Sequence, residues 1–167
     1  MNSQLSHNAT PFSPKKFPTV VLCDSLHSPA NIGALFRVCE AFGVEEILFY
    51  NCVLNIESNR LLRTSRNTHQ KMAYREVTDL ASEVARLKSK SYTFIGLEIT
   101  QNSVPLETLS LPKSSKTVLC IGGERHGISE DLLNHTTVTT HITMYGENSS
   151  MNVIQAAAIA LFSLTKL

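Results

Sequence analysis

Residues 19–43 read T-V-V-L-C-D-S-L-H-S-P-A-N-I-G-A-L-F-R-V-C-E-A-F-G, and this stretch decides the fold class. Its first five residues are a continuous apolar run, which is typical of a strand buried on both faces of a parallel sheet. Ser28 and Pro29 then predict a helix start, with Ser28 as the cap and Pro29 at the first helical position. Gly43 is expected to end that helix.

The rest of the chain repeats this alternation of strand and helix. Apolar runs predict further strands over residues 46–50, 92–97, 117–121 and 138–142. Helix-start signals predict helices over residues 79–89, over 130–134 and from Val153 onward, and at most a helical turn within the polar segment 57–72. The pattern predicts an α/β domain over residues 19–167, with a mainly parallel sheet and helices on both faces. Residues 1–18, rich in Asn, Ser and Pro, are expected to be a flexible leader.

The composition, with 43% hydrophobic and 17% charged residues, is that of an ordinary globular protein. The sequence has no run of about 18 apolar residues, so we expect no membrane span. Its four cysteines are far apart, without a C-x-x-C pair or metal-ligand spacing to the histidines. We therefore expect reduced cysteines, a cytoplasmic protein and no bound metal.

The formal net charge is only +1, but basic residues cluster in one segment that contains no acid. A solvated charged face is the commoner meaning of such a run. The Asn, Thr, His and Gln residues between them would also suit phosphate and ribose contacts. The candidate RNA-binding residues are Arg60, Arg63, Arg66, Lys71 and Arg75.

Polar residues follow several predicted strands. They are Glu98 and three glycine-containing segments, residues 24–37, 122–129 and 144–152. Ligands of open parallel sheets bind beyond the carboxyl ends of the strands, so one ligand could touch all of these segments. The last segment carries Ser149, Ser150 and Asn152 before an apolar helix, where a helix start needs only one cap.

Residues 122–129 nearly match the phosphate-binding pattern G-x-x-x-x-G-K-[ST]. Ile128 stands at the lysine position, however, and Glu124 would repel a triphosphate. We interpret this stretch as a loop whose glycines let backbone approach a ligand. In the first helix, Gly33 and Arg37 share a face, and we expect the missing side chain at Gly33 to leave room for Arg37 to lie towards the sheet edge.

Taken together, these motifs resemble the SpoU, or TrmH-type, branch of the SPOUT RNA methyltransferases. The pattern N-x-G-x-x-x-R is matched by Asn31, Gly33 and Arg37, and G-x-E-x-x-G-[IL]-S by residues 122–129. Residues 142–153 match I-P-M-x-G…S-[LM]-N-[VL], with threonine in place of the proline. The resemblance covers about residues 18–166; residues 67 and 68 are Asn and Thr where the family often has Gly and Ala.

The resemblance implies methylation of a ribose 2′-hydroxyl of tRNA or rRNA, with S-adenosylmethionine as the methyl donor. It also implies a C-terminal trefoil knot, an exception to the rule that chains are unknotted. A homodimer is implied as well, with the active site assembled at the subunit interface. The residues implied to surround the cofactor are Leu97, Gly122, Ile142 and Met151.

The family proposal makes the arginine at Arg37 the general base. Because a guanidinium stays protonated at physiological pH, we instead expect Arg37 to grip the substrate phosphate and stabilise charge at the hydroxyl oxygen. The side chains expected to orient Arg37 and the ribose are Asn31, Glu124, Ser150 and Asn152, which leaves Ser149 as the helix cap.

Two alternatives stay open on the sequence alone. The first is a catalytically silent RNA- or nucleotide-binding module of the same fold. The second is a knotted methyltransferase that acts on a base.

Overall fold

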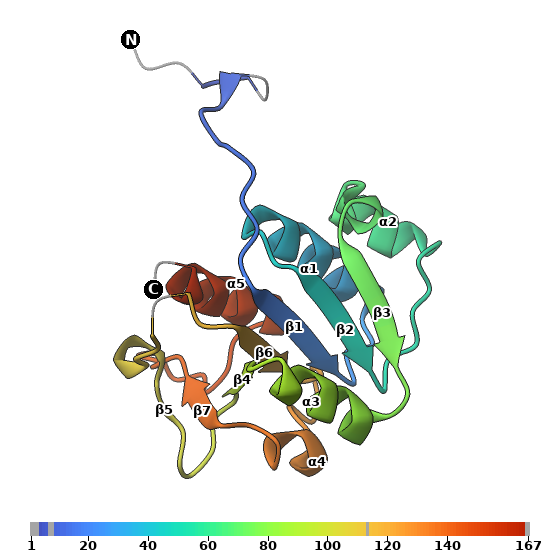
Figure 1. Cartoon of the computed structure of the whole chain (residues 1–167). Coiled ribbons are helices and arrows are strands. Elements are labelled where there is room, and N and C mark those ends of the chain that lie inside the picture. The colour runs from blue at the N-terminus through green and yellow to red at the C-terminus, as the bar shows by residue number, and fades with distance from the viewer. Residues whose placement is uncertain (1–3, 7–8, 113, 166–167) are drawn as a thin grey trace.

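The computed structural model describes residues 4–6, 9–112 and 114–165. Parallel strands form one seven-stranded sheet in the order β3-β2-β1-β6-β4-β7-β5 (Figure 1). The strands are β1 (Thr19–Asp24), β2 (Glu46–Tyr50), β3 (Ala73–Val77), β4 (Thr93–Leu97), β5 (Val104–Pro105), β6 (Thr117–Ile121) and β7 (Val138–His141). The chain is therefore an α/β protein with a parallel sheet, as the alternation of its sequence predicts.

Helices cover both faces of the sheet, as expected (Figure 1). On one face lie α1 (Pro29–Ala41), α2 (Asn59–Ser65) and α5 (Val153–Leu164), and on the other lie α3 (Leu80–Ser89) and α4 (Glu130–Leu133). Strand β1 is buried throughout: Val21 belongs to the core beneath α1 and α5, and Leu22 to the core beneath α3 and α4. Burial on both faces is why this strand needs a continuous apolar sequence.

The helix caps are mostly those that the sequence predicts. Ser28 accepts a hydrogen bond from the Asn31 amide at the start of α1, and Asp79 accepts one from Ser82 at the start of α3. For α5, the expectation that Ser149 caps the helix was wrong. Asn152 caps this helix through a 2.9 Å hydrogen bond from the Ile154 amide to its Oδ1, because the capping side chain must directly precede the first turn.

Two strands were missed, and both are weak in sequence. Strand β5 has only two residues, and β3 lies at the edge of the sheet. Most side chains of β3 are not buried, so this strand can contain the charged residues Arg75 and Glu76. It therefore lacks the continuous apolar run that predicts a buried strand. The 3₁₀ turn η2 (Thr68–Gln70) precedes β3. The expected short helical turn is thus α2 followed by η2.

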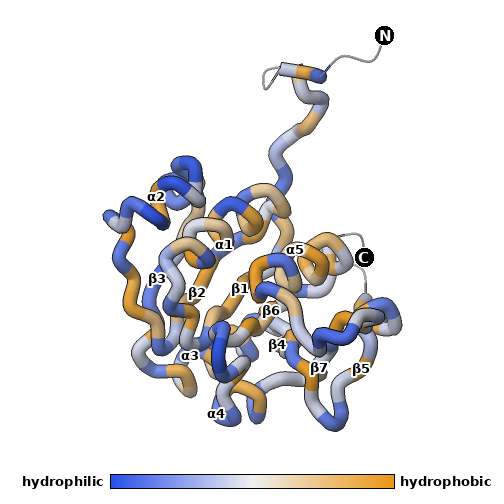
Figure 2. Tube along the Cα trace, turned by 180° about the vertical axis from the view of Figure 1, so that it is seen from behind, coloured by the Kyte–Doolittle hydropathy of each residue, from blue (hydrophilic) through white to orange (hydrophobic). Residues whose placement is uncertain are grey.

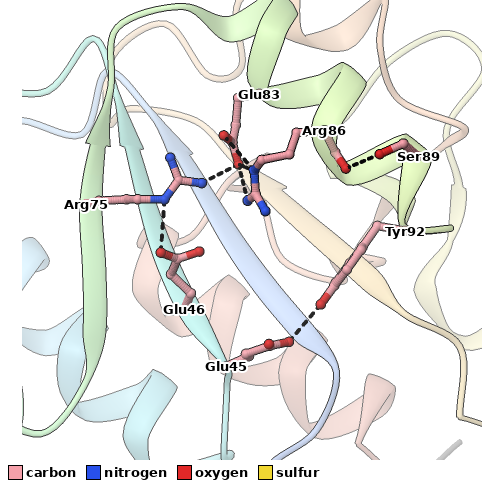
Figure 3. Close-up of polar contacts among 7 residues, drawn as sticks. All are labelled: Glu45, Glu46, Arg75, Glu83, Arg86, Ser89 and Tyr92. Carbon is pink, nitrogen blue, oxygen red and sulfur yellow. Dashed lines mark hydrogen bonds and ion pairs between the residues drawn. The ribbon is translucent and has the colours of Figure 1, made fainter.

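Arg75 is held in an ion-pair network between β3, β2 and α3 (Figure 3). Its Nε lies 3.0 Å from a carboxylate oxygen of Glu46, and its terminal nitrogen pairs with Glu83, which Arg86 also contacts. Nearby, the Tyr92 hydroxyl donates to Glu45 at 2.7 Å. Because its guanidinium already pairs with two carboxylates, Arg75 is less available to an RNA phosphate than the other four candidate residues.

Residues 9–14 are exposed and lead away from the domain (Figure 1), whereas Lys16 donates a 2.7 Å hydrogen bond to the carbonyl oxygen of Val44. The division into a leader over residues 1–18 and a domain from residue 19 stays a prediction, as does the threading of the trefoil knot. No helix in the described part of the chain is both long and apolar enough to cross a membrane.

The network predicts a pH-dependent contribution to stability at Glu83, whose side chain is 7% exposed. Burial opposes its ionisation, but hydrogen bonds from Arg86 and Arg75 outweigh burial and lower its pKa. A carboxyl with a lowered pKa contributes stability above its unfolded-state pKa and loses it as the pH falls through the folded-state pKa. Glu83→Gln should reduce the free energy of unfolding at neutral pH by about 1–2 kcal/mol, since partly exposed arginines are screened.

Urea unfolding at neutral pH, and again at acidic pH where Glu83 is protonated, measures this effect. The wild type and Glu83→Gln should converge in acid. The exposed Glu57→Gln serves as the control. A difference between wild type and Glu83→Gln that stays constant with pH would contradict the assignment.

Candidate active site

A pocket of about 380 Å³ lies at the carboxyl edge of the sheet. The loops that follow β4, β6 and β7 and the first turn of α5 form its wall. All four residues expected around a cofactor are among its lining residues: Leu97, Gly122, Ile142 and Met151. Loops from distant parts of the sequence meet here because parallel strands end at one edge.

Two carboxylates hold the loop of residues 122–129 in place. The Glu98 carboxylate accepts hydrogen bonds from the amides of Ile99 and Ile128, both at 3.0 Å. Fully buried Asp24 accepts from the Ser129 amide at 2.8 Å and from the Ser25 hydroxyl at 2.9 Å. The ends of β4 and β1 are thereby tied to consecutive amides of the same loop.

The glycines of this loop allow it to close on itself. Gly123 and Gly127 exchange backbone hydrogen bonds of 3.2 and 3.1 Å. A side chain at Gly122 would overlap the backbone of Gly127, and Gly127 itself has a φ of 65°. The near-match to a phosphate loop is explained by this closed turn, with no phosphate required.

Three candidate catalytic residues form one hydrogen-bonded chain. The Asn31 side-chain amide donates to Glu124 Oε1 at 2.8 Å, and the Asn152 side-chain amide donates to Asn31 Oδ1 at 3.2 Å. Backbone amides of His27 and Ser28 also donate to Glu124. Partial burial alone would raise the pKa of Glu124, but these hydrogen bonds, led by that from Asn31, lower it. Glu124 is therefore a fixed carboxylate that orients amides at the rim of the pocket.

Arg37 is not brought to this chain of hydrogen bonds. It is exposed, lies outside the pocket lining, and makes no hydrogen bond or ion pair with any described residue. It stands six positions after Asn31 in α1, about 9 Å along the helix axis at the usual rise. Ser150 does line the pocket, so the structure unites four of the five candidate catalytic residues and leaves Arg37 apart.

The expectation that Gly33 leaves room for Arg37 was wrong. A Cβ at this position would overlap the Thr64 hydroxyl and the Leu61 carbonyl oxygen of α2. Gly33 is therefore required for the close approach of α2 to α1 and does not make room for Arg37.

The basic segment lies on α2 and the turn that follows it. Arg60, Arg63, Arg66 and Lys71 are exposed. The turn is fixed from inside by a 2.8 Å hydrogen bond between buried Ser65 and His69. Residues 66 and 67 have positive φ values of 47° and 68°, and asparagine tolerates this conformation where the family often has glycine.

Sequence reasoning placed Asp24 and Glu98 at the sheet edge but gave them no role. The available signal was an acidic residue directly after a buried strand. It also gave no role to Arg125, which lines the pocket. Among the described residues, no group of three or more His, Cys, Asp or Glu side chains could hold a metal ion.

The fold and the pocket together define an α/β protein with a pocket of small-ligand size at the carboxyl edge of a parallel sheet. Residues 18–162 match the model of the SpoU rRNA Methylase family, and the chain belongs to this family.

Its relatives and structural neighbours agree with this membership. The chain is 28% identical over 145 residues to the 23S rRNA (guanosine(2553)-2′-O)-methyltransferase RlmP of Bacillus subtilis, covering 87% of this chain and 57% of that protein. It is 29% identical over 142 residues to the tRNA (guanosine(18)-2′-O)-methyltransferase of Thermus thermophilus, covering 85% and 71%. The AdoMet-bound rRNA methyltransferase of Sinorhizobium meliloti shares the fold, with a TM-score of 0.82 at 19% identity, covering 93% and 58%. The chain thus spans little more than half of the Bacillus relative.

The carboxylate contacts predict that Glu98→Gln loosens the loop of residues 122–129. A glutamine amide keeps the size of the side chain but can no longer accept from both the Ile99 and Ile128 amides. Loss of one charge-assisted hydrogen bond, worth about 1.5–3 kcal/mol, should speed exchange of the Ile128 amide at least tenfold.

Hydrogen–deuterium exchange of peptides that span residues 122–132 measures this change. Strand β2 is far from the substitution in the sheet order and should exchange as in wild type. Unchanged exchange at Ile128 would rule out the positioning role of Glu98.

Proposed function

We propose that this chain transfers a methyl group from S-adenosylmethionine to a ribose 2′-hydroxyl of RNA. The observation that carries this proposal is the pocket, in which Leu97, Gly122, Ile142 and Met151 meet beside the Asn31–Glu124–Asn152 hydrogen bonds. The printed activities of the Bacillus and Thermus relatives, both RNA 2′-O-methyltransferases, support the same reaction.

The pocket residues fit the proposed cofactor. A volume of about 380 Å³ lies within the range of roughly 300–1,000 Å³ for small-molecule sites. Apolar side chains of Leu97, Ile142 and Val153 suit a purine ring, and Gly122 and Gly123 add pocket wall that carries no side chain. The bound form of the S. meliloti neighbour supports this choice of cofactor.

The residues of this chain would supply position and charge. When bound, S-adenosylmethionine carries an electrophilic methyl group on its sulfonium. Asn152 and Ser150 would hold the ribose so that its hydroxyl oxygen approaches the methyl carbon, and such positioning accounts for much of the rate in group transfers. The guanidinium of Arg37 would bind the adjacent phosphate and stabilise negative charge on the hydroxyl oxygen.

A homodimer would bring Arg37 to the pocket. Since Arg37 lies outside the pocket lining of its own chain, a second copy could supply it. Helix α5 is largely hydrophobic (Figure 2). Two of its apolar side chains are exposed all the same, Ile159 at 43% and Phe162 at 50%, which supports such an interface. An apolar helix face of this kind is typical of a contact surface.

For the substrate we propose tRNA or rRNA, the classes named for the Thermus and Bacillus relatives. We also propose that the protein acts in the cytoplasm. Its four free cysteines, three of them buried, are typical of a reducing compartment.

Arg37→Ala should abolish methyl transfer and preserve cofactor binding, because Arg37 would act on the RNA and not on the cofactor. The measurement is transfer of tritiated methyl groups to total RNA, with nucleoside mass spectrometry of the product and calorimetry of cofactor binding. A 2′-O-methylated nucleoside supports the proposal, whereas a methylated base indicates the alternative chemistry. No transfer by wild type to any RNA would indicate a silent binding module, and full activity of Arg37→Ala would refute its role.

A mixed-dimer experiment separates the two possible origins of Arg37. Gly122→Val should disrupt the pocket wall, because a side chain there would overlap the backbone of Gly127, and Arg37→Ala should leave the pocket intact. Circular dichroism of each variant verifies that it is folded. Mixed in equal amounts after subunit exchange, the two inactive variants should regain about a quarter of wild-type activity if Arg37 acts on the partner's pocket. No recovery would place Arg37 at the pocket of its own chain or exclude a dimeric site.

Replacing both Arg63 and Arg66 with Ala should weaken RNA binding and reduce its salt dependence, because two phosphate contacts would no longer release counterions. The slope of log K against log salt should fall by about 1.5–2. Filter binding across a salt series measures it, with Lys90→Ala as a control of equal charge type on the opposite side of the sheet. An unchanged slope would count against this surface.

A further inference from the structure

The ionisable side chains that line the pocket differ in whether they hydrogen-bond to other groups of the protein. Among the described lining residues they are Glu98, Glu124, Arg125 and His141. Glu98 accepts from two backbone amides, and Glu124 accepts from two backbone amides and from Asn31. His141 shares a 2.9 Å hydrogen bond with Ser103. These three side chains are therefore committed to holding the pocket together.

Arg125 is different. It is exposed, it lines the pocket, and within the described chain it makes no hydrogen bond or ion pair. It lies in the turn between Gly123 and Gly127, which the pair of backbone hydrogen bonds closes from both sides. Its backbone is thereby fixed at the pocket wall while its guanidinium is available to a ligand.

We propose that Arg125 binds the carboxylate at the methionyl end of S-adenosylmethionine, an inference that rests on the proposed function. A guanidinium fits a carboxylate through two parallel hydrogen bonds. The two carboxylates of the pocket complement the rest of this ligand, since the sulfonium and the ammonium are both cationic. Arg125 is the one permanent cation among the described lining residues, and the ligand has one permanent anion.

An RNA phosphate is the competing partner for Arg125. The structure favours the cofactor because Arg125 lines the pocket itself, whereas Arg60, Arg63 and Arg66 lie on or directly after α2, outside the pocket lining. The two partners predict different results for the same variant.

The test compares S-adenosylmethionine with its decarboxylated form, which lacks the carboxylate and keeps the sulfonium and ammonium. Dissociation constants are measured by calorimetry on the full chain for wild type, Arg125→Ala and Lys90→Ala, the last as a control for loss of one exposed cation. Wild type should bind the decarboxylated ligand roughly tenfold more weakly than the intact one, as expected for loss of a charge-assisted contact. Arg125→Ala should bind both ligands equally, at the wild-type level for the decarboxylated form.

Each other outcome overturns the inference in a distinguishable way. If Arg125→Ala binds S-adenosylmethionine as wild type does but binds RNA more weakly, Arg125 contacts a phosphate. If it loses affinity for both ligands by the same factor, Arg125 shapes the pocket without contacting the carboxylate. Should wild type bind neither ligand, the proposed function itself fails. Thermal unfolding followed by circular dichroism verifies that each variant is folded.

Discussion

The site depends on hydrogen bonds from backbone amides to carboxylates at the carboxyl edge of the sheet. Asp24 ties the end of β1 to Ser129, and Glu98 ties the end of β4 to Ile128. Glu124 ties the same loop back to the start of α1. A buried carboxylate is tolerated when its oxygens accept hydrogen bonds, and loop amides beyond a strand lack ladder partners. The carboxylates and the loop amides thus satisfy each other's hydrogen-bonding needs. These bonds fix the conformation of the loops that form the pocket wall.

In this arrangement some charged side chains are held by other groups of the protein, and others remain available to a ligand. The acids near the pocket are engaged by the protein, while Arg37 and Arg125 make no hydrogen bond or ion pair with any described residue. Arg75 and Arg86 show the opposite case, because both are held by Glu83. One of these unpaired arginines lines the pocket and the other lies apart from it, and guanidinium groups suit the carboxylate of the proposed cofactor and the phosphates of RNA.

The location of Arg37 connects the chemistry to assembly. Helix α1 starts beside the pocket, where Asn31 is hydrogen-bonded to the lining residues Glu124 and Asn152, and the helix carries Arg37 away from them. Gly33, between them, serves the packing of α2. The start of the helix thus contacts the pocket residues, whereas Arg37 in its middle is exposed and available to a second copy of the chain, which is the reason for proposing a dimer.

The sequence alone determined five of the seven described strands, the helices other than α2, and the resemblance to the family. Strands such as β1 and β6 are buried on both faces and must be apolar throughout, so their signal is local. Edge strand β3 was missed because partly exposed positions accept charge. Only the tertiary structure decided that Gly33 packs against α2 and what Asp24 and Glu98 do. The partners of these two carboxylates lie 105 and 30 residues away, and no local pattern specifies contacts made by folding.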